Sequence, residues 1–264
     1  MVYTPFDFNE AISQRREWAE TGLREGSPVV GVSIEDGLFL LTVRQTQRKI
    51  FEIYDRLVYS AIGNQSDIEA IRIAAIDVAH REGFERSPDD VTAHRLVGFA
   101  LSPPLKKLFG DSFNAPAVVR AIFGEMGTAP QNDLFYILNY DGEFFQRERC
   151  AAVAGTPEAE ERIVLHLAEI APDTPLRDAV PMALRAWAVG VLLSSRHAPG
   201  NGEEPAAADA DISDDQVLQE IRRRLSSGSV EVGLLDRRTR RESKFRLLSA
   251  AEIQDIVKDF ASND

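Results

Sequence analysis

The side chains that could perform catalysis or bind a metal are few and scattered. The four histidines, His80, His94, His166 and His197, share no metal-ligand spacing, and none stands in an H-E-x-x-H arrangement. Ser194 and His197 come close in the sequence SSRH, but they lie where a helix is expected to end beside an acidic segment. A nucleophile and its base need fixed geometry. We therefore expect no metal site and no serine–histidine nucleophile.

The single cysteine, Cys150, offers no redox or metal chemistry of its own. One cysteine forms no internal disulfide and lacks the partners of a cysteine-rich metal site, so we interpret it as a small apolar core residue in a reducing compartment. The sequence also contains neither G-x-x-x-x-G-K-[ST] nor G-x-G-x-x-G, the patterns of common nucleotide sites. No cofactor is expected.

The charge balance is strongly acidic, with a formal net charge of −12. Nucleic-acid binding depends on clustered cationic side chains, so we expect no nucleic-acid partner. One dense basic run occurs near the C-terminus, at Arg237, Arg238, Arg240, Arg241, Lys244 and Arg246. We interpret it as a solvated hairpin turn, in preference to a phosphate-binding patch.

Composition indicates a globular protein, since 264 residues with 44% apolar content can bury a sizeable core. The longest apolar stretches, residues 28–34 and 38–43, are far shorter than the roughly 20 residues that a membrane span requires. The first residues have neither a basic leader before an apolar core nor a small-residue cleavage site. We expect a cytoplasmic protein without a membrane partner.

The elements that must position any site alternate between strands and paired helices. Strands are expected over residues 28–34, 38–43, 49–53, 57–62, 117–123, 134–139, 150–154, 230–236 and 245–248. Helices are expected from the N-cap Asn9 to about residue 23 and over residues 66–81, 87–101, 155–169, 175–193, 216–225 and 249–260. Because each sheet must bury both faces and the helices arrive in pairs, this order predicts two stacked antiparallel sheets flanked by helices, a four-layer αββα sandwich of the α+β class.

Residues 197–214, with the sequence HAPGNGEEPAAADADISD, interrupt this pattern. They lose apolar periodicity and collect glycine, proline, alanine and acidic residues. Such a composition cannot bury enough apolar surface to order itself, so a flexible acidic insertion is expected here.

Several phrases, in order along nearly the whole chain, are similar to those of one known family. They are NEAISQRREWAETGLREGS, VVGVSIEDGLFLL, RKIFEIYDRLVYSAIGNQSDIEAIRIAAIDVAHREGF, DDVTAHRLVGFA, LFYILNYDGEFF and VEVGLLDRRTRRESKFRLLSAAEIQDIV. They resemble the helices, hairpins and strands of bacterial, actinobacterial-type 20S proteasome α subunits, most specifically in KI-EIYDR and VEVGLLDR. The likeness is weaker over residues 109–130. It implies the αββα fold of N-terminal-nucleophile (Ntn) hydrolases, with residues 1–26 as gate segment and first helix and 27–264 as the main domain.

The resemblance also implies that this chain has no catalytic residue. In the catalytic β subunits of such particles, self-cleavage exposes an N-terminal threonine whose own amine is the base for its hydroxyl. Here Ser27 takes that position inside the chain, and Val43 takes the position of the catalytic acid, while Lys49 matches the lysine of the motif. The chain is expected to be a non-catalytic structural and gating subunit of a threonine-type endopeptidase complex.

The partners implied by the resemblance are copies of the chain and two other proteins. Seven copies would form a ring that stacks on a β-subunit ring, and Tyr3, Pro5, Phe6 and Phe8 would gate its pore. Lys49 and Gly26 would line a pocket for the C-terminal tails of an activator ring, either an ATPase or an ATP-independent one. Lysine supplies a point cation for a tail carboxylate.

Two other functions are compatible with the same fold. The chain could be an active Ntn hydrolase that is cleaved before Ser27, which would then supply both nucleophile and free amine. It could also be a stand-alone scaffold that has lost its β partner. Intact mass distinguishes the first alternative, and co-expression with a β subunit distinguishes the second.

Overall fold

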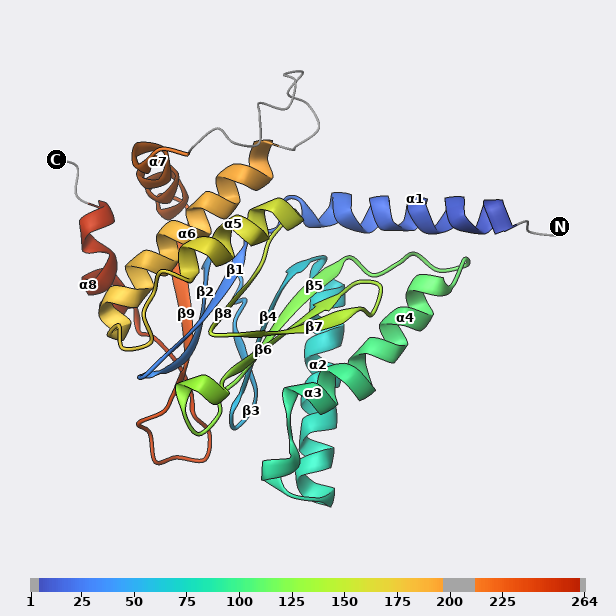
Figure 1. Ribbon diagram of the computed structural model, residues 1–264, viewed down its shortest axis with the longest axis horizontal. Coiled ribbons are helices and arrows are strands. Elements are labelled where there is room, and N and C mark those ends of the chain that lie inside the picture. The colour runs from blue at the N-terminus through green and yellow to red at the C-terminus, as the bar shows by residue number, and fades with distance from the viewer. Residues whose placement is uncertain (1–4, 197–211, 262–264) are drawn as a thin grey trace.

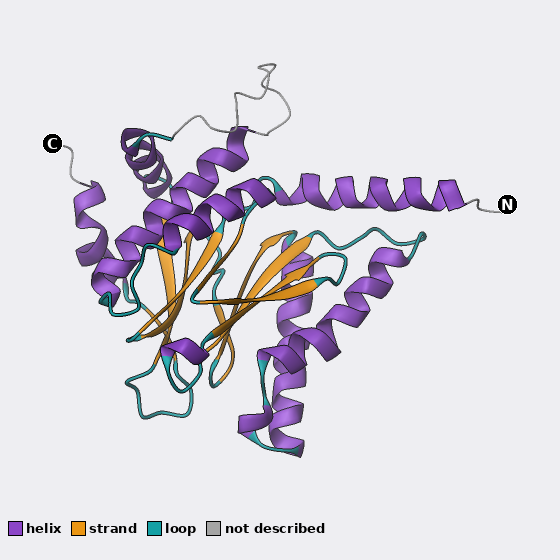
Figure 2. Ribbon diagram, viewed as in Figure 1, coloured by secondary structure: helices purple, strands orange, loops and turns teal. Residues whose placement is uncertain are grey.

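The computed structural model describes residues 5–196 and 212–261, which form two stacked β-sheets enclosed by helices. Within these residues there are ten strands, five in each antiparallel sheet. Helices lie outside both sheets, so the fold is a four-layer αββα sandwich (Figure 1; Figure 2). The predicted fold class is confirmed.

The first sheet, sheet A, has the strand order β10-β9-β2-β1-β8. Its strands are β1 (Val29–Ile34), β2 (Gly37–Arg44), β8 (Cys150–Val153), β9 (Ser229–Asp236) and β10 (Phe245–Leu247). Successive residues of β2 alternate between its two faces: Phe39 and Leu41 face the outer helices, whereas Leu38 and Leu40 face the second sheet. Both faces are therefore apolar, as the near-continuous hydrophobic run predicts.

The second sheet, sheet B, has the strand order β3-β4-β5-β6-β7. Its strands are β3 (Phe51–Tyr54), β4 (Leu57–Gly63), β5 (Val119–Glu125), β6 (Leu134–Asn139) and β7 (Phe144–Glu148). Residues such as Val58, Ile122 and Phe135 pack between the two sheets. Fully burying side chains of this size contributes about 1.5–3 kcal/mol each, so the interior holds the sheets together.

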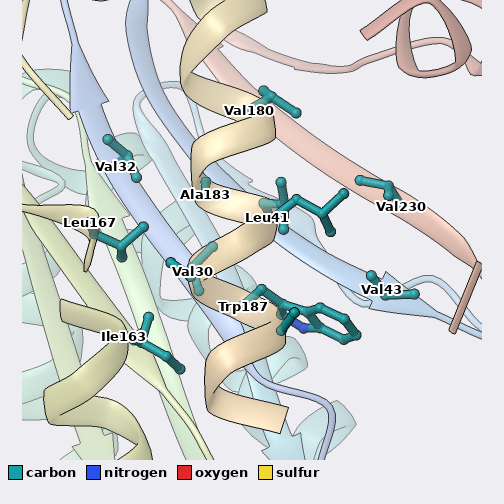
Figure 3. Packing of buried hydrophobic residues seen from close by; sticks show 14 of the residues in the cluster. Val30, Val32, Leu41, Val43, Ile163, Leu167, Val180, Ala183, Trp187 and Val230 are labelled. Atoms are coloured by element: carbon teal, nitrogen blue, oxygen red, sulfur yellow. The ribbon is translucent and has the colours of Figure 1, made fainter. Parts of the chain in front are cut away.

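The helices are divided between the two outer faces. Sheet A is covered by α5 (Pro157–Leu167) and α6 (Leu176–Arg196), with α7 (Asp214–Leu225) and α8 (Ala250–Ala261) beyond them (Figure 1). Sheet B is covered by α2 (Gln65–Glu85), α3 (Ala93–Arg95) and α4 (Ser102–Gly110). Figure 3 shows Trp187 reaching from α6 toward the strand that bears Val43.

The first helix, α1 (Pro5–Leu23), begins earlier than the sequence predicts. The expected N-cap, Asn9, lies inside the helix. Proline is favoured in the first helical turn, since its fixed φ suits the helix and its missing N–H is not needed there. Ala19 and Leu23 are buried as the helical spacing predicts, and Ile12 packs beside them.

The helix predicted over residues 87–101 is composed of several segments and ends later. Ser87 caps only the short 3-10 turn η1 (Pro88–Asp90), and Thr92 caps α3 by accepting a hydrogen bond from the Arg95 N–H. A π-helical segment, η2 (Leu96–Leu101), then leads directly into α4. Two prolines follow Ser102 without ending the helix, because they fall in the first turn of α4.

Two predictions near the C-terminus need correction. Residues 197–211 of the acidic insertion lie outside the described residues, but its last residue, Asp214, begins α7, and Ser213 forms a capping box with Gln216. The basic run is not wholly solvated either. Arg237 is 17% exposed and pairs at 2.6 Å with Asp133, which is fully buried.

The remaining short helix, η3 (Pro130–Asn132), precedes β6. None of the helices in the described residues is both long enough and apolar enough to span a membrane.

Candidate functional site

A cavity of about 430 Å³ lies at the end of the sandwich where β1 starts and β2 finishes. It contains both residues predicted to bind an activator tail, Gly26 and Lys49. Its wall is completed by residues from four further segments, including Ser27, Val43, Arg44, Trp187, Arg224 and Gly228. Two positions that are 23 residues apart in the chain thus share one cavity.

The Gly26 end of the cavity is fixed by close backbone packing. The Gly26 N–H donates to Leu23 O at 2.9 Å and closes the last turn of α1. A Cβ on Gly26 would lie 2.9 Å from Cβ of Ile62, a separation that real Cβ atoms essentially never show. Only glycine fits this junction between α1 and β1 without a shift of the surrounding chain.

The start of β1 is anchored through the carbonyl of Pro28. That oxygen accepts hydrogen bonds from Thr42 Oγ1 at 2.7 Å and from Trp187 Nε1 at 2.9 Å, both buried. Hydrogen bonds buried in a low-dielectric interior hold their partners firmly in place. The floor of the cavity is therefore rigid.

The Lys49 side chain is directed at the main chain of the α1–β1 junction. Its Nζ donates to Ser27 O at 2.9 Å. Burial of this side chain lowers the pKa of Lys49 to about 8, and the negative charge of Glu231 opposes that shift. An ammonium uses one of its three protons in this bond, so two remain for an anion in the cavity.

The segment that carries Lys49 rests on the buried carboxylate of Glu231, from β9. Glu231 Oε2 accepts from the Lys49 N–H at 3.1 Å, and Oε1 accepts from the Ile50 N–H at 3.0 Å. Arg44 Nε lies 3.2 Å from the same carboxylate, which is 5% exposed. Because Lys49 and Ile50 bond to Glu231, β3 begins at Phe51, two residues later than the sequence predicts.

Two arginines of α7 add positive charge to the cavity wall. Arg223 and Arg224 both line it, and both pair with Glu220, at 2.6 Å and 2.9 Å respectively. Since Glu220 neutralises one of these two charges, the pair adds a net positive charge. The arrangement suits the binding of an anionic group.

The hydrogen bonds around Ser27 do not suit nucleophilic catalysis by its hydroxyl. Ser27 Oγ donates to the Val43 carbonyl at 2.8 Å, and Lys49 Nζ contacts the Ser27 carbonyl, not its hydroxyl. A carbonyl oxygen is no general base, and the Ser27 nitrogen is part of a peptide bond. Val43 is an apolar side chain, 6% exposed, and can neither orient Lys49 nor hold a proton.

The other candidate residues form no site. Across residues 5–196 and 212–261, no three histidine, cysteine or acidic side chains are placed to hold a metal ion. Ser195 Oγ donates to Val191 O within α6, whereas His197 lies outside the described residues. His94 packs against the rings of Phe99 and Tyr136.

The predicted gate residues stay untested by the structure. Tyr3 lies outside the described residues. Pro5, Phe6 and Phe8 fall within α1, but their side chains are outside the description.

Glu231, Arg223 and Arg224 were not predicted as site residues. One signal was present for Glu231: it is the single acid within the apolar run VEVGLL, and a charge in a buried strand requires partners. The two arginines belong to the sequence RRR on α7, which resembles any solvated helix face.

Comparison with known proteins finds several proteasome α subunits that are similar to this chain over nearly its whole length. No protein-family model matches the chain. A proteasome subunit alpha of Frankia casuarinae is 31% identical over 247 residues, covering 91% of this chain and 92% of the relative. Those of Frankia alni and Acidothermus cellulolyticus are each 27% identical, and the aligned regions cover 97–98% of this chain and 98% of each relative.

Proposed function

The chain belongs to the proteasome subunit alpha family, and from that membership we propose that it is a non-catalytic, gating subunit of a cytoplasmic bacterial 20S proteasome. Seven copies would form each outer ring, which stacks on a β-subunit ring that hydrolyses the substrate. Residues 1–26 would provide the gate and first helix, and residues 27–264 the main domain.

The observation that carries this proposal is the cavity that holds Lys49 and Gly26. The Lys49 ammonium and the net positive charge of the α7 arginines suit a peptide carboxylate, which is the one anion that every protein C-terminus supplies. A salt bridge between that carboxylate and partly buried Lys49 is screened less than one on the surface. The C-terminal tail of an activator ring is therefore the ligand that we propose.

Binding of a tail in the cavity would affect the gate because the cavity contacts the α1–β1 junction, and α1 follows the gate segment in the chain. Lys49 already bonds the Ser27 carbonyl, and Gly26 joins that residue to α1. The junction is also packed from the other side: a Cβ on Gly155 would lie 2.5 Å from Arg24 O. A tail that draws the Lys49 ammonium away would alter the position of α1, and with it the equilibrium between closed and open gate.

The absence of catalysis rests on the hydrogen bonds of Ser27. Its hydroxyl donates to a carbonyl, and the nearby lysine is bonded to the Ser27 main chain. These contacts support a structural role for the residue that replaces the nucleophile of active relatives.

Co-expression of the chain with the β-type subunit of the same genome tests the proposal. Size-exclusion chromatography and electron microscopy should show stacked seven-fold rings, and intact mass should show that the chain keeps its first 26 residues. A chain that stays monomeric beside its β partner would contradict the assembly. A mature chain that starts at Ser27 and hydrolyses peptides alone would contradict the non-catalytic role.

A further inference from the structure

Lys49 is presented by a short segment that forms no ladder hydrogen bonds of its own. Residues 45–50 connect β2 to β3, and the main chain at Lys49 and Ile50 bonds to a side chain instead of a strand. Such a connection is expected to be mobile unless something fixes it. The group that fixes it comes from β9, 181 residues further along the chain from Ile50.

Glu231 contacts this segment from near the start of β9, at one end of sheet A. It is paired in register with Thr42 of β2, the strand that leads into the segment. Its carboxylate is 5% exposed, accepts hydrogen bonds from two main-chain N–H groups and forms an ion pair with the Arg44 guanidinium. A buried carboxylate is tolerated when it is paired in this way, and each bond to it is charge-assisted.

We infer that Glu231 is a positioning residue of the Lys49 pocket: its carboxylate fixes the main chain that presents Lys49 and places a negative charge beside the Lys49 side chain. The biological role of this positioning rests on the proposed function of the pocket. The experiment below measures only the titration of Lys49, so its result does not depend on that function. The carboxylate contributes in two ways, as an acceptor for main-chain N–H groups and as a negative charge beside a buried cation.

The second contribution decides whether Lys49 can bind an anion. Burial favours the neutral amine, and the charge of Glu231 counteracts it, so the pKa of Lys49 stays at about 8. The other charged groups at the cavity are mainly cations, which disfavour a charged lysine. The cations are Arg44 at the end of β2, Arg48 beside Glu231, and Arg223 and Arg224 on α7. The acids besides Glu231 are Glu25, before Gly26, and Glu220, which pairs with the two α7 arginines.

A direct titration of Lys49 tests the inference in the assembled α–β particle. Acetic anhydride acetylates only neutral amines, so the extent of Lys49 acetylation, read by peptide mass spectrometry at a series of pH values, gives the midpoint of its titration. Glu231→Gln keeps the size of the side chain and one oxygen acceptor but removes the charge. We expect the midpoint of Lys49 to lie near pH 8 in the native particle and to fall in Glu231→Gln, because the opposing negative charge is lost.

Glu220→Gln is the matched control. Glu220 is also a buried carboxylate beside the cavity, at 7% exposed, but it pairs with Arg223 and Arg224 and makes no bond to the Lys49 segment. Its substitution leaves one more arginine charge uncompensated at the cavity wall, so it should lower the Lys49 midpoint by less than Glu231→Gln does. A purely structural effect of losing a buried acid would appear in both variants.

An unchanged Lys49 midpoint in Glu231→Gln would overturn the inference, as would an equal fall in Glu220→Gln. If Glu231→Gln does not assemble with β subunits, the same titration is carried out on the unassembled native and Glu231→Gln chains. An unchanged Lys49 midpoint there again overturns the inference. The result is independent of activators. If Lys49→Ala leaves activator stimulation intact, the proposed function fails while the titration still decides the role of Glu231.

Discussion

The Lys49 ammonium donates a hydrogen bond to the Ser27 carbonyl at 2.9 Å. The lysine of the motif therefore contacts the main chain at the position where active relatives hold their nucleophile, and the Ser27 hydroxyl donates elsewhere, to Val43 O. In this chain, Lys49 connects two segments: its ammonium, from the β2–β3 connection, bonds to the main chain of the α1–β1 junction. This arrangement supports the proposed use of the pocket for binding a peptide tail and not for catalysis.

Replacing Lys49 by alanine is expected to abolish activator-stimulated protein degradation by the assembled particle. Truncating one partner of a partly buried charge pair costs about 2–5 kcal/mol, which corresponds to a loss of affinity of at least about 30-fold. Degradation of a folded substrate is measured with and without the activator ring. Ring assembly and basal hydrolysis of a short peptide should remain.

Lys107→Ala is the control for this experiment, because Lys107 is a solvent-exposed lysine on α4. It should leave stimulation unaffected. Undiminished stimulation in Lys49→Ala would show that the activator does not use this pocket.

Deleting residues 1–8 is expected to raise the rate of peptide hydrolysis by the assembled particle. The segment contains three aromatic residues and a proline, a composition that can pack against copies of itself around an axial pore. Hydrolysis of a fluorogenic peptide is compared between full-length and truncated particles that contain equal amounts of β subunit. If the truncated particle assembles and its rate does not rise, these residues are not a barrier.

The sandwich was predictable because its signals are local. The change from helical to strand periodicity after residue 27 and the pairing of helices can both be read within short windows, and both sheets follow from them. Lys49 and Gly26 were predicted from family resemblance alone. The role of Glu231 was not predicted because its hydrogen-bond donors, the main-chain N–H groups of Lys49 and Ile50, are 181–182 residues away in the chain. Main-chain N–H groups belong to almost every residue, so no sequence pattern identifies these two as partners.

Arg237 is a second residue whose environment the sequence did not reveal: it was predicted to be solvated, but it pairs with a buried acid. Six basic residues within ten positions favour solvation, and three of them, Arg238, Arg240 and Arg241, are exposed. Arg237 differs because Asp133, 104 residues earlier in the chain, is fully buried beside it and also accepts a hydrogen bond from Ser33 at 2.6 Å. Only the stacking of the two sheets brings these three residues together.

Arg237→Ala is therefore expected to destabilise the subunit by about 3 kcal/mol, since it leaves the buried Asp133 carboxylate without its cation. Its neighbour Arg238 pairs with Asp36 but is 79% exposed, and Arg238→Ala should change the unfolding free energy by less than about 0.5 kcal/mol. Urea unfolding of both variants checks this difference. Equal effects would show that Asp133 does not depend on Arg237.

The stability of the subunit should fall as pH rises through the weakly acidic range, because of Glu160. This residue of α5 is buried, and burial raises its pKa to about 7, with Arg120 at 2.6 Å opposing the shift. A carboxyl whose pKa is higher in the folded chain than in the unfolded chain binds its proton more tightly when folded. Its contribution is therefore most favourable below about pH 4.5 and is lost as the pH rises to about 7.

The expected loss from this one group is up to about 3 kcal/mol between these pH values, superimposed on the titration of all other groups. Glu160→Gln removes the titration, so the unfolding free energy of the variant should depend less steeply on pH over the same window. Urea unfolding at closely spaced pH values measures both slopes. Glu169→Gln, an exposed acid two residues after the end of α5, is the control. Equal slopes for the native chain and Glu160→Gln would mean that Glu160 is already ionised in the folded chain at pH 4.5, held so by Arg120.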